Sequence, residues 1–428
     1  MRRNPLPPRV EDYLDIVCSQ IRFREAHPEI RRELAGHFED IIEGYVAEGL
    51  DAAEAVERAV QQMGNPEIVG RQLNEAHRPQ FDWQLFTSVA LLTLLGLWAM
   101  YAVEVSASTP IAGTFRSKLL WSVAGLAAGA LLFSIDYRPF LRFSWQLFLL
   151  TSVVVAFVAF TLPQYIPYLD LTTILFLLSI AGIFANWDWQ HPHSPFKAMV
   201  LLLVPSFLYL ALPETLSILQ YQFGFWLLLA STHPSWRHMR MMVPATLGLA
   251  VAVVLWIVHT PHRLVRIASW LAPGSDPLGS GYPIEQASNA IHQAGPWGQG
   301  LTTSLPVLPE AASEFIFAYL IFTLGWVAGI AIALLCLFLL VRMWHVSARI
   351  QDRFGRNLII ALLAVFSLHY GLNLLMNLGM IPVLGVDLPL ISYGGRQAVY
   401  LAMAGLALGV YRRRHWGTAP ILQHGHLS

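Results

Sequence analysis

The sequence predicts an all-α membrane protein with about ten transmembrane helices behind a small, soluble helical domain. Three observations indicate this fold class. Hydrophobic residues make up 55% of the 428 residues and charged residues only 13%, whereas a soluble protein carries about 25% charged residues. The charges gather at one end, since residues 1–80 hold 10 arginines and 15 acidic residues. The rest of the chain contains apolar runs long enough to cross about 30 Å of hydrocarbon.

Residues 1–80 have the patterning of soluble amphipathic helices. Apolar residues recur at spacings of three and four along residues 10–21 and 30–45, which predicts two helices that each bury one face. Asp51 followed by Glu54 is typical of a helix N-terminus. The stretch starts polar, unlike the basic and then apolar start of a signal peptide. We therefore expect a cytoplasmic helical domain at residues 1–80.

The remaining chain carries about ten apolar runs of transmembrane length. They lie near residues 83–104, 118–135, 144–162, 170–186, 197–213, 215–231, 241–259, 314–341, 358–383 and 396–411. We expect a membrane domain at residues 81–415 and a cytoplasmic tail at residues 416–428.

Lysine and arginine residues are shared unevenly between the loops that join these runs. If residues 1–80 lie inside, the inner loops hold 12 of them and the outer ones 5, with Lys118 among the outer five. Positive charge accumulates in loops that are not translocated, so both termini should be cytoplasmic. Residues 260–313 then form one long extracellular loop, and loops of this length are usually functional or disordered.

Several polar residues fall within or at the edges of the predicted spans, where they should face the protein interior or water. His369, Asn373 and Asn377 follow one another at intervals of four and form one stripe. For this stripe we favour hydrogen bonding between helices over ligand contact. Glu314 opens the eighth span at its outer end. It is either a simple helix cap or a functional carboxylate, which the helix dipole keeps ionised unless it is buried.

Arg396 directly follows Gly394 and Gly395 at the outer start of the last span. Two glycines before a helix N-terminus let the backbone approach an anion closely, and the guanidinium adds a forked positive charge. The outer mouth could therefore hold a phosphate-bearing ligand. The alternative is an arginine that anchors the helix at the lipid headgroups.

Composition and spacing exclude several other classes of site. The formal net charge is zero and no basic run exceeds three residues, which argues against a nucleic-acid partner. Cys18 and Cys336 are too few for a disulfide framework or a cysteine metal site. His191 and His193 share a loop and are interpreted as a solvent-exposed pair, so the sequence predicts no metal site there.

Two stretches in the second half of the chain carry a more specific pattern. The first comprises Arg263, Arg266, Asp276 to Tyr282, Gln286, Trp297 to Leu301, Leu308 to Ala311, Glu314 to Phe317 and Leu324-Gly325, and the second comprises Asn373, Gly379 to Pro382 and Leu388 to Gly395. Together they resemble the SEDS family (shape, elongation, division and sporulation), which includes RodA and FtsW. The resemblance covers residues 260–411. Residues 27–34 and 63–66 resemble, more weakly, a helical prefix domain found ahead of some bacterial permease-like proteins.

The resemblance implies a ten-span glycosyltransferase of the bacterial cytoplasmic membrane that polymerises lipid II, typically beside a class B penicillin-binding protein. In such a transfer a carboxylate near the acceptor hydroxyl acts as general base, and cations or helix N-termini stabilise the leaving phosphates. The resemblance makes Glu314 the catalytic base. It implies substrate contacts from Arg263, Arg266, Asp276, Gln286, Asn373, Ser392, Gly394, Gly395 and Arg396. It leaves open whether a divalent cation assists.

The chain departs from the family pattern at several positions. Where the family usually has His-Thr-Asp, this chain has Ala312-Ser313-Glu314, so the carboxylate is kept on a side chain that is one methylene longer. Where the family usually has Ser after Gly-Gly, this chain has Arg396. Residues 213–216 read Pro-Glu-Thr-Leu where the family usually has Pro-Asp-Leu-Gly, and the family's Gln-Pro-Ser-Glu segment is not found in this chain. Two alternatives therefore stay open: a noncatalytic relative that binds a polyprenyl-phosphate lipid or a partner enzyme, and a flippase for a lipid-linked sugar.

Overall fold

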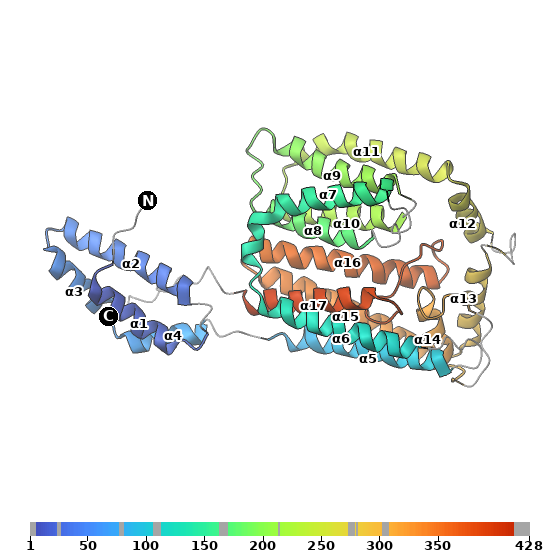
Figure 1. Ribbon diagram of the computed structural model, residues 1–428, viewed down its shortest axis with the longest axis horizontal. Helices are drawn as coiled ribbons and strands as arrows, with labels where there is room; N and C mark the ends of the chain where they lie inside the picture. The colour runs from blue at the N-terminus through green and yellow to red at the C-terminus, as the bar shows by residue number, and fades with distance from the viewer. Residues whose placement is uncertain are drawn as a thin grey trace. The chain divides into compact units, whose positions relative to one another are not determined.

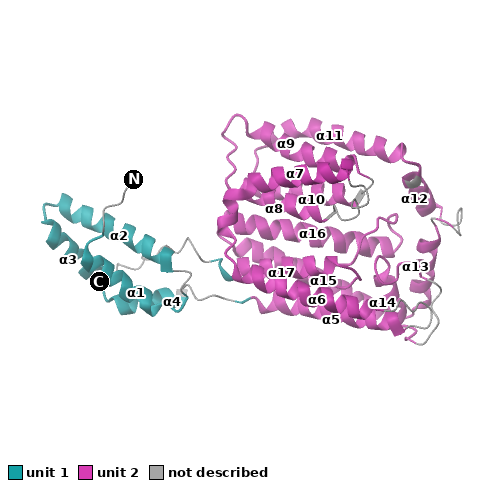
Figure 2. Ribbon diagram, in the orientation of Figure 1, with its two compact units in different colours: residues 1–81, 412–428 teal, residues 82–411 magenta. Residues whose placement is uncertain are grey.

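In a computed structural model every regular element among the described residues is a helix, as Figure 1 shows. The structure describes residues 6–23, 27–76, 81–105, 113–161, 170–212, 215–272, 279, 281–301 and 308–414. The chain divides into two compact units, one of residues 1–81 with 412–428 and one of residues 82–411 (Figure 2).

The smaller unit contains four helices: α1 (Pro8–Gln20), α2 (His27–Ala47), α3 (Ala52–Met63) and α4 (Pro66–Ala76). Its core holds the apolar positions expected from their spacing, and Tyr13 packs edge-on against Phe38 at 5.2 Å between ring centroids. Asp51 caps α3 by accepting from the Ala53 amide at 3.3 Å. At the other end of the chain, the Arg412 guanidinium lies over the Phe23 ring of the same unit.

The larger unit is a bundle of membrane-type helices. Its helices are α5 (Trp83–Val105), α6 (Thr114–Ser134), the short 3-10 helix η2 (Arg138–Phe143), α7 (Ser144–Thr161), α8 (Asp170–Ala185), α9 (Ser194–Leu210), α10 (Thr215–Ser231), α11 (Trp236–Val258), α12 (Pro261–Leu271), α13 (Tyr282–Gln293), α14 (Ile316–Leu324), α15 (Trp326–Arg349), α16 (Arg353–Asn377) and α17 (Arg396–Arg412). Six segments in the described residues are long and apolar enough to cross a membrane, and three shorter apolar helices add to them. Each of the ten predicted spans contains a helix, and the all-helical, multi-pass fold class is confirmed.

Helix α16 is the buried centre of this bundle. It packs against α8, α10 and α15, and it lies between the group α7–α11 and the group α5, α6, α15 and α17 in Figure 1. Large apolar side chains on α7, α11 and α15 are exposed instead, as expected of surfaces that face lipid. Helices α12 and α13 lie across the end of the bundle where α16 ends.

The eighth predicted span, residues 314–341, is not one continuous helix. It is broken at Gly325, which has a φ of +90° and separates α14 from α15. Residues 295–300 pack against this break through backbone hydrogen bonds. The Gln299 amide donates to the Phe322 carbonyl at 2.8 Å, and the Trp326 amide donates to the Gly295 carbonyl at 3.1 Å. The sequence does not reveal the break, because the residues on both sides of Gly325 are apolar and a lone glycine does not end a hydrophobic run.

The ninth predicted span, residues 358–383, also has different limits in the structure. Helix α16 begins earlier, at Arg353, because Asp352 accepts from the Phe354 and Gly355 amides and caps it. It ends at Asn377, and Gly379 beyond it has a φ of +71°. The residues from there to Arg396 form an irregular segment that returns to the bundle.

Candidate functional site

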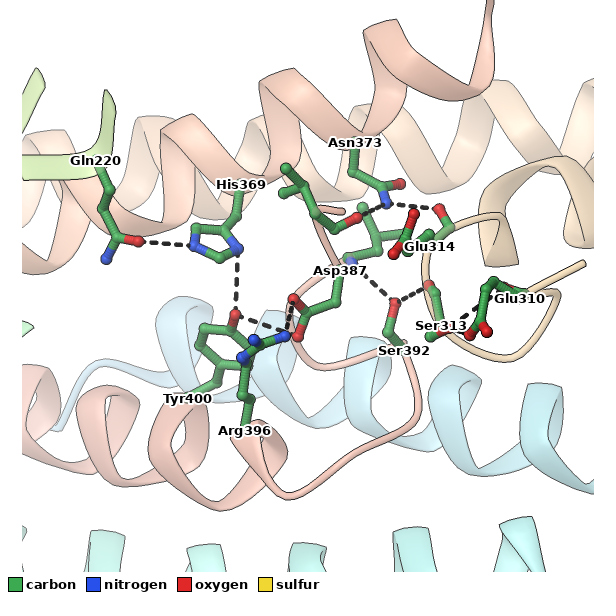
Figure 3. A network of polar contacts seen from close by, with 12 residues as sticks. Gln220, Glu310, Ser313, Glu314, His369, Asn373, Asp387, Ser392, Arg396 and Tyr400 are labelled. Atoms are coloured by element: carbon green, nitrogen blue, oxygen red, sulfur yellow. Dashed lines mark hydrogen bonds and ion pairs between the residues drawn. The ribbon is translucent and has the colours of Figure 1, made fainter. Parts of the chain in front are cut away.

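Glu314 lies in the last turn before α14, outside the long helices that cross the membrane. Its backbone carbonyl accepts two hydrogen bonds from α16, one from the Asn373 side-chain amide at 2.9 Å and one from the Asn377 side-chain amide at 2.9 Å. Both asparagines are buried. The polar stripe of α16 therefore fixes the main chain from which the Glu314 carboxyl projects (Figure 3).

The same two asparagines also hold the segments on either side. Asn377 accepts from the Ala318 amide at 2.9 Å, at the start of α14. Asn373 donates to the Val386 carbonyl at 2.6 Å. Asn377 thus connects α16 to the start of α14, and Asn373 connects it to the irregular segment that contains Val386. Polar side chains inside a membrane bundle commonly join its segments through such hydrogen bonds.

The Glu314 carboxyl is half-buried and close to the irregular segment after α16. A Cβ atom added at Gly385 would lie 3.5 Å from its Oε1 atom. Burial and the neighbouring carboxylate of Glu310 raise the pKa of Glu314 above its usual value, and the charge of Arg266 opposes this shift. A raised pKa makes the ionised carboxylate a stronger base.

A second set of contacts attaches the segment before α17 to the Glu314 turn. The Ser392 hydroxyl donates to the Ser313 carbonyl at 2.7 Å and accepts from the Leu388 amide at 2.8 Å. The Tyr393 amide donates to the Ala312 carbonyl at 2.8 Å. The two segments of the chain that carry the family-like motifs therefore lie side by side at Glu314.

Lys118 of α6 supports this segment from the other side. Its side chain is fully buried, and its ammonium donates to the Leu390 carbonyl at 3.0 Å, the Ser392 carbonyl at 2.7 Å and the Gln397 side-chain oxygen at 2.9 Å. The expectation that Lys118 belongs to an outer loop is wrong, because α6 already begins at Thr114. An ionisable residue within a span is the signal that could have marked it as a site residue.

Arg396, the first residue of α17, forms an ion pair with Asp387. Its Nη1 atom donates to the Asp387 carboxylate at 2.9 Å, and the Asp387 side chain is 7% exposed against 34% for Arg396. The sequence does not single out Asp387, because the eight residues between the partners are not helical and their spacing predicts no contact.

The ion pair ends a row of polar groups that crosses the bundle in Figure 3. The Tyr400 hydroxyl lies 3.5 Å from the Asp387 carboxylate and 3.2 Å from Nδ1 of His369. The other ring nitrogen of His369 lies 3.1 Å from the Gln220 side-chain oxygen on α10. Helices α10, α16 and α17 are thus joined by buried polar contacts beside the Glu314 turn.

The structure brings together some of the residues predicted for the site and separates others. Glu314, Asn373, Ser392 and Arg396 share one region, and Gly394 and Gly395 lead into α17 there. Arg263 instead donates to the Thr260 hydroxyl of its own turn at 3.0 Å and lies over the Trp256 ring.

The remaining predicted positions lie on or near the segment that leads to the site. Arg266 is on α12, and its charge acts on Glu314. Gln286 is half-buried on α13, which packs on α14. Asp276 and Glu214 lie outside the described residues.

A divalent cation has no evident place among these groups. Within the residues that the structure describes, no three His, Cys, Asp or Glu side chains gather as metal ligands. The oxygen groups around Glu314 are carbonyls and the carboxylates of Glu310 and Asp387; Glu310 accepts from the Ser313 hydroxyl and Asp387 pairs with Arg396, and we derive no step through a metal.

A multi-pass helical bundle with a half-buried carboxyl between two family-like motifs defines a SEDS-type membrane protein. Sequence comparison leads to the same class: the family model for FtsW, RodA and SpoVE, described as a cell cycle protein, matches residues 168–415. The match covers more than half of the chain, so this protein belongs to the FtsW/RodA/SpoVE family, and the predicted family is confirmed.

Two curated relatives illustrate the similarity. The chain is 37% identical over 218 residues to the peptidoglycan glycosyltransferase MrdB of Escherichia coli K12, which is 49% of this chain and 58% of that protein. It is 27% identical over 370 residues to a probable peptidoglycan glycosyltransferase FtsW of Nitrosomonas europaea, which is 80% of this chain and 95% of that protein. The chain thus spans little more than half the length of the E. coli relative.

Solved structures share the fold. One solved chain comes from work on the structural coordination of polymerization and crosslinking by a peptidoglycan synthase complex. It matches with a TM-score of 0.63 and 22% identity, over 78% of this chain and 98% of that one. Thermus thermophilus RodA matches with a TM-score of 0.56 and 20% identity, over 78% of this chain and 97% of that one. At these identities the likeness concerns the fold alone.

Proposed function

We propose that this protein polymerises lipid II, the lipid-linked disaccharide-peptide, at the outer face of the bacterial cytoplasmic membrane. The observation that carries the proposal is Glu314, a half-buried carboxyl of raised pKa whose backbone is held by two buried asparagines. Relatives described as peptidoglycan glycosyltransferases support it. The process served would be cell-wall synthesis for shape, division or sporulation.

The proposed transfer needs a base and a place for phosphate. An acceptor hydroxyl attacks the anomeric carbon of the lipid-linked sugar, so that a new carbon–oxygen bond forms. The bond from that carbon to the polyprenyl pyrophosphate breaks, and the pyrophosphate leaves with the electron pair. The hydroxyl proton passes to the Glu314 carboxylate. The leaving phosphates require positive charge, and Arg266 and Arg396 both act on Glu314 electrostatically.

Other residues would position these groups. Lys118 holds the 390–392 backbone through three hydrogen bonds, and Ser392 attaches that backbone to the Glu314 turn. Asp387 fixes the guanidinium of Arg396. Gly394 and Gly395 would let the backbone approach the pyrophosphate at the start of α17. Gln286 and Asn373 remain proposed substrate contacts.

The proposal includes a topology and a partner. The distribution of lysine and arginine favours both termini in the cytoplasm and Glu314 at the outer face. The proposed partner is a class B penicillin-binding protein that cross-links the strands, because one solved neighbour is described as a peptidoglycan synthase complex.

The test is a lipid II polymerisation assay with the purified full-length protein. Glu314→Gln keeps the shape of the side chain but removes the base, and polymer should fall by at least a hundredfold. Glu314→Asp retains the carboxyl and should keep measurable activity. Glu285→Gln on α13 is the matched control and should stay within about twofold of the parent.

Two outcomes would overturn the enzyme assignment. Unchanged polymer from Glu314→Gln would remove the base from the proposed mechanism. Binding of lipid II by the parent protein without any polymer would instead identify a noncatalytic relative, whose partner enzyme performs the transfer.

A further inference from the structure

A hollow lies at the end of the membrane unit opposite to Glu314. It is formed where α8 and α10 end and α16 begins, and its volume is about 370 Å³. Arg356 lines it, and Asn373 lies 17 residues further along the same helix. At 1.5 Å per residue the two positions are roughly 25 Å apart, so this hollow is separate from the Glu314 site.

The charged side chains of this hollow are predominantly basic. Arg353 and Arg356 both line it, together with the single carboxylate of Asp188. The Asp188 carboxylate accepts from the Gln190 amide at 2.8 Å, and the nearby Asp352 caps α16. In the described part of the chain neither arginine forms an ion pair. Two guanidinium groups against one carboxylate leave the described lining of the hollow with a net positive charge.

Two residues that line the hollow each carry a buried side-chain N–H with no acceptor among the residues that the structure describes. The two groups are Nε1 of Trp187, just after α8, and Nε of Arg356, on α16. A buried N–H group without an acceptor is costly and uncommon. Two neutral lining groups make their contacts elsewhere, since the Ser231 hydroxyl donates to Asn357 at 2.9 Å and Asn357 donates to the Ala181 carbonyl at 3.1 Å.

We propose that this hollow binds a phosphate group. Guanidinium groups bind phosphate through forked hydrogen bonds. The donors come from the ends of different helices, and a phosphate has oxygens on several sides to meet them, whereas a carboxylate has only two. A water molecule takes about 30 Å³, so the hollow has room for a phosphate with an organic substituent.

Two sources can supply this chemistry. The hollow lies at the ends of helices of membrane length, and the tryptophans Trp187, Trp189 and Trp236 gather at the same end. Tryptophan is enriched at headgroup depth, where both a phospholipid headgroup and a soluble phosphate can reach the site.

The test uses the purified full-length protein and two probes. Inorganic phosphate binding is measured by phosphorus-31 NMR line broadening in detergent. Phosphatidylglycerol binding is measured by native mass spectrometry from doped micelles. Trp187→Phe keeps an aromatic side chain but replaces the indole with a smaller phenyl ring and removes the N–H, and we expect about tenfold weaker binding. Arg356→Gln should weaken it further, and Arg353→Gln should weaken it without touching a buried donor.

Arg349→Gln is the matched control, because Arg349 is an exposed arginine at the same end of the bundle and does not line the hollow. It should bind both probes within twofold of the parent. Glu314→Gln should also bind both probes normally, so that failure of the proposed polymerase activity would not affect this result. Thermal unfolding of each variant checks that it is folded.

Each outcome decides the proposal. Binding of inorganic phosphate that Trp187→Phe and Arg353→Gln weaken would support a soluble ligand. Binding of the lipid alone, with the same sensitivity, would support a headgroup. No binding of either probe, or equal binding by the parent, Trp187→Phe, Arg353→Gln and Arg349→Gln, would overturn the phosphate site.

Discussion

The guanidinium of Arg396 lies 2.9 Å from the carboxylate of Asp387, and the two residues fix the start of α17 to the irregular segment that precedes it. The negative charge of Asp387 balances the positive charge of Arg396 close to Glu314. The pair thus brings a positive group to the site without leaving an unbalanced charge at the end of a helix that is otherwise apolar.

The ion pair gives a prediction for stability. Asp387→Asn should lower the free energy of unfolding by about 1–2 kcal/mol, because Asp387 is buried but Arg396 is partly solvated. The double variant Asp387→Asn with Arg396→Gln should cost less than the sum of the two single changes. Thermal unfolding in one detergent measures all three, and strictly additive effects would mean that the pair contributes nothing.

The raised pKa of Glu314 gives a prediction for pH dependence. Activity requires the ionised carboxylate, so it should fall as pH decreases, and the midpoint should lie above that of an unperturbed glutamate. Removing the Glu310 carboxylate by Glu310→Gln should move this midpoint to lower pH. The pH–rate profile of lipid II polymerisation measures both, and a midpoint that Glu310→Gln leaves in place would contradict the electrostatic cause.

The same pKa shift has a consequence for stability with the opposite sign. An acid whose pKa is raised by folding binds its proton more tightly in the folded state, so stability falls as pH rises from the unfolded pKa to the folded one. Glu314→Gln should therefore unfold at the same or a higher temperature than the parent at neutral pH. A markedly lower melting temperature would show that Glu314 has a structural role instead.

Lys118 should be required for the shape of the site. Lys118→Met keeps the length of the side chain but leaves three buried acceptors without their donor, and the free energy of unfolding should fall by about 2 kcal/mol or more. Amide exchange between residues 386 and 396 should accelerate more than in α16. Uniform acceleration across the bundle would argue for global destabilisation rather than a local role.

Gly325 should be intolerant of any side chain. A Cβ atom there would clash with the Pro296 carbonyl oxygen, and the φ of +90° is unfavourable for other residues. Gly325→Ala should destabilise the protein by about 2 kcal/mol or more. Gly371→Ala in α16 is the matched control, because nothing lies within 4 Å of its added Cβ, and it should be neutral or slightly stabilising. Equal melting temperatures for the two variants would contradict the prediction.

Hydrophobicity and spacing were sufficient to predict the spans and the polar stripe of α16, because both are local properties of the sequence. His369, Asn373 and Asn377 were placed on one helix face by their intervals of four, and the structure places them on one helix, with all three buried. The break at Gly325 was missed because its cause is the hydrogen bonding of residues 295–300, which lie elsewhere in the chain.

The candidate site could be predicted only where a motif marked it. Glu314 and Ser392 belong to such motifs, and the contact between their two segments follows from the fold rather than from the sequence. Lys118 is 270 residues or more away from its acceptors along the chain. Nothing in the sequence connects positions so far apart. The spacing of Asp387 and Arg396 does not predict their pairing either.

Helix α16 is continuous over its 25 residues, from Arg353 to Asn377. One end contributes arginines to the basic hollow, and the other holds the carbonyl of Glu314 through two asparagine amides. A rod of roughly 37 Å that tilts about its middle moves its two ends in opposite directions. A shift of Arg356 that tilts the helix would therefore displace the backbone under Glu314 as well, and it would also change how α16 packs against α8, α10 and α15.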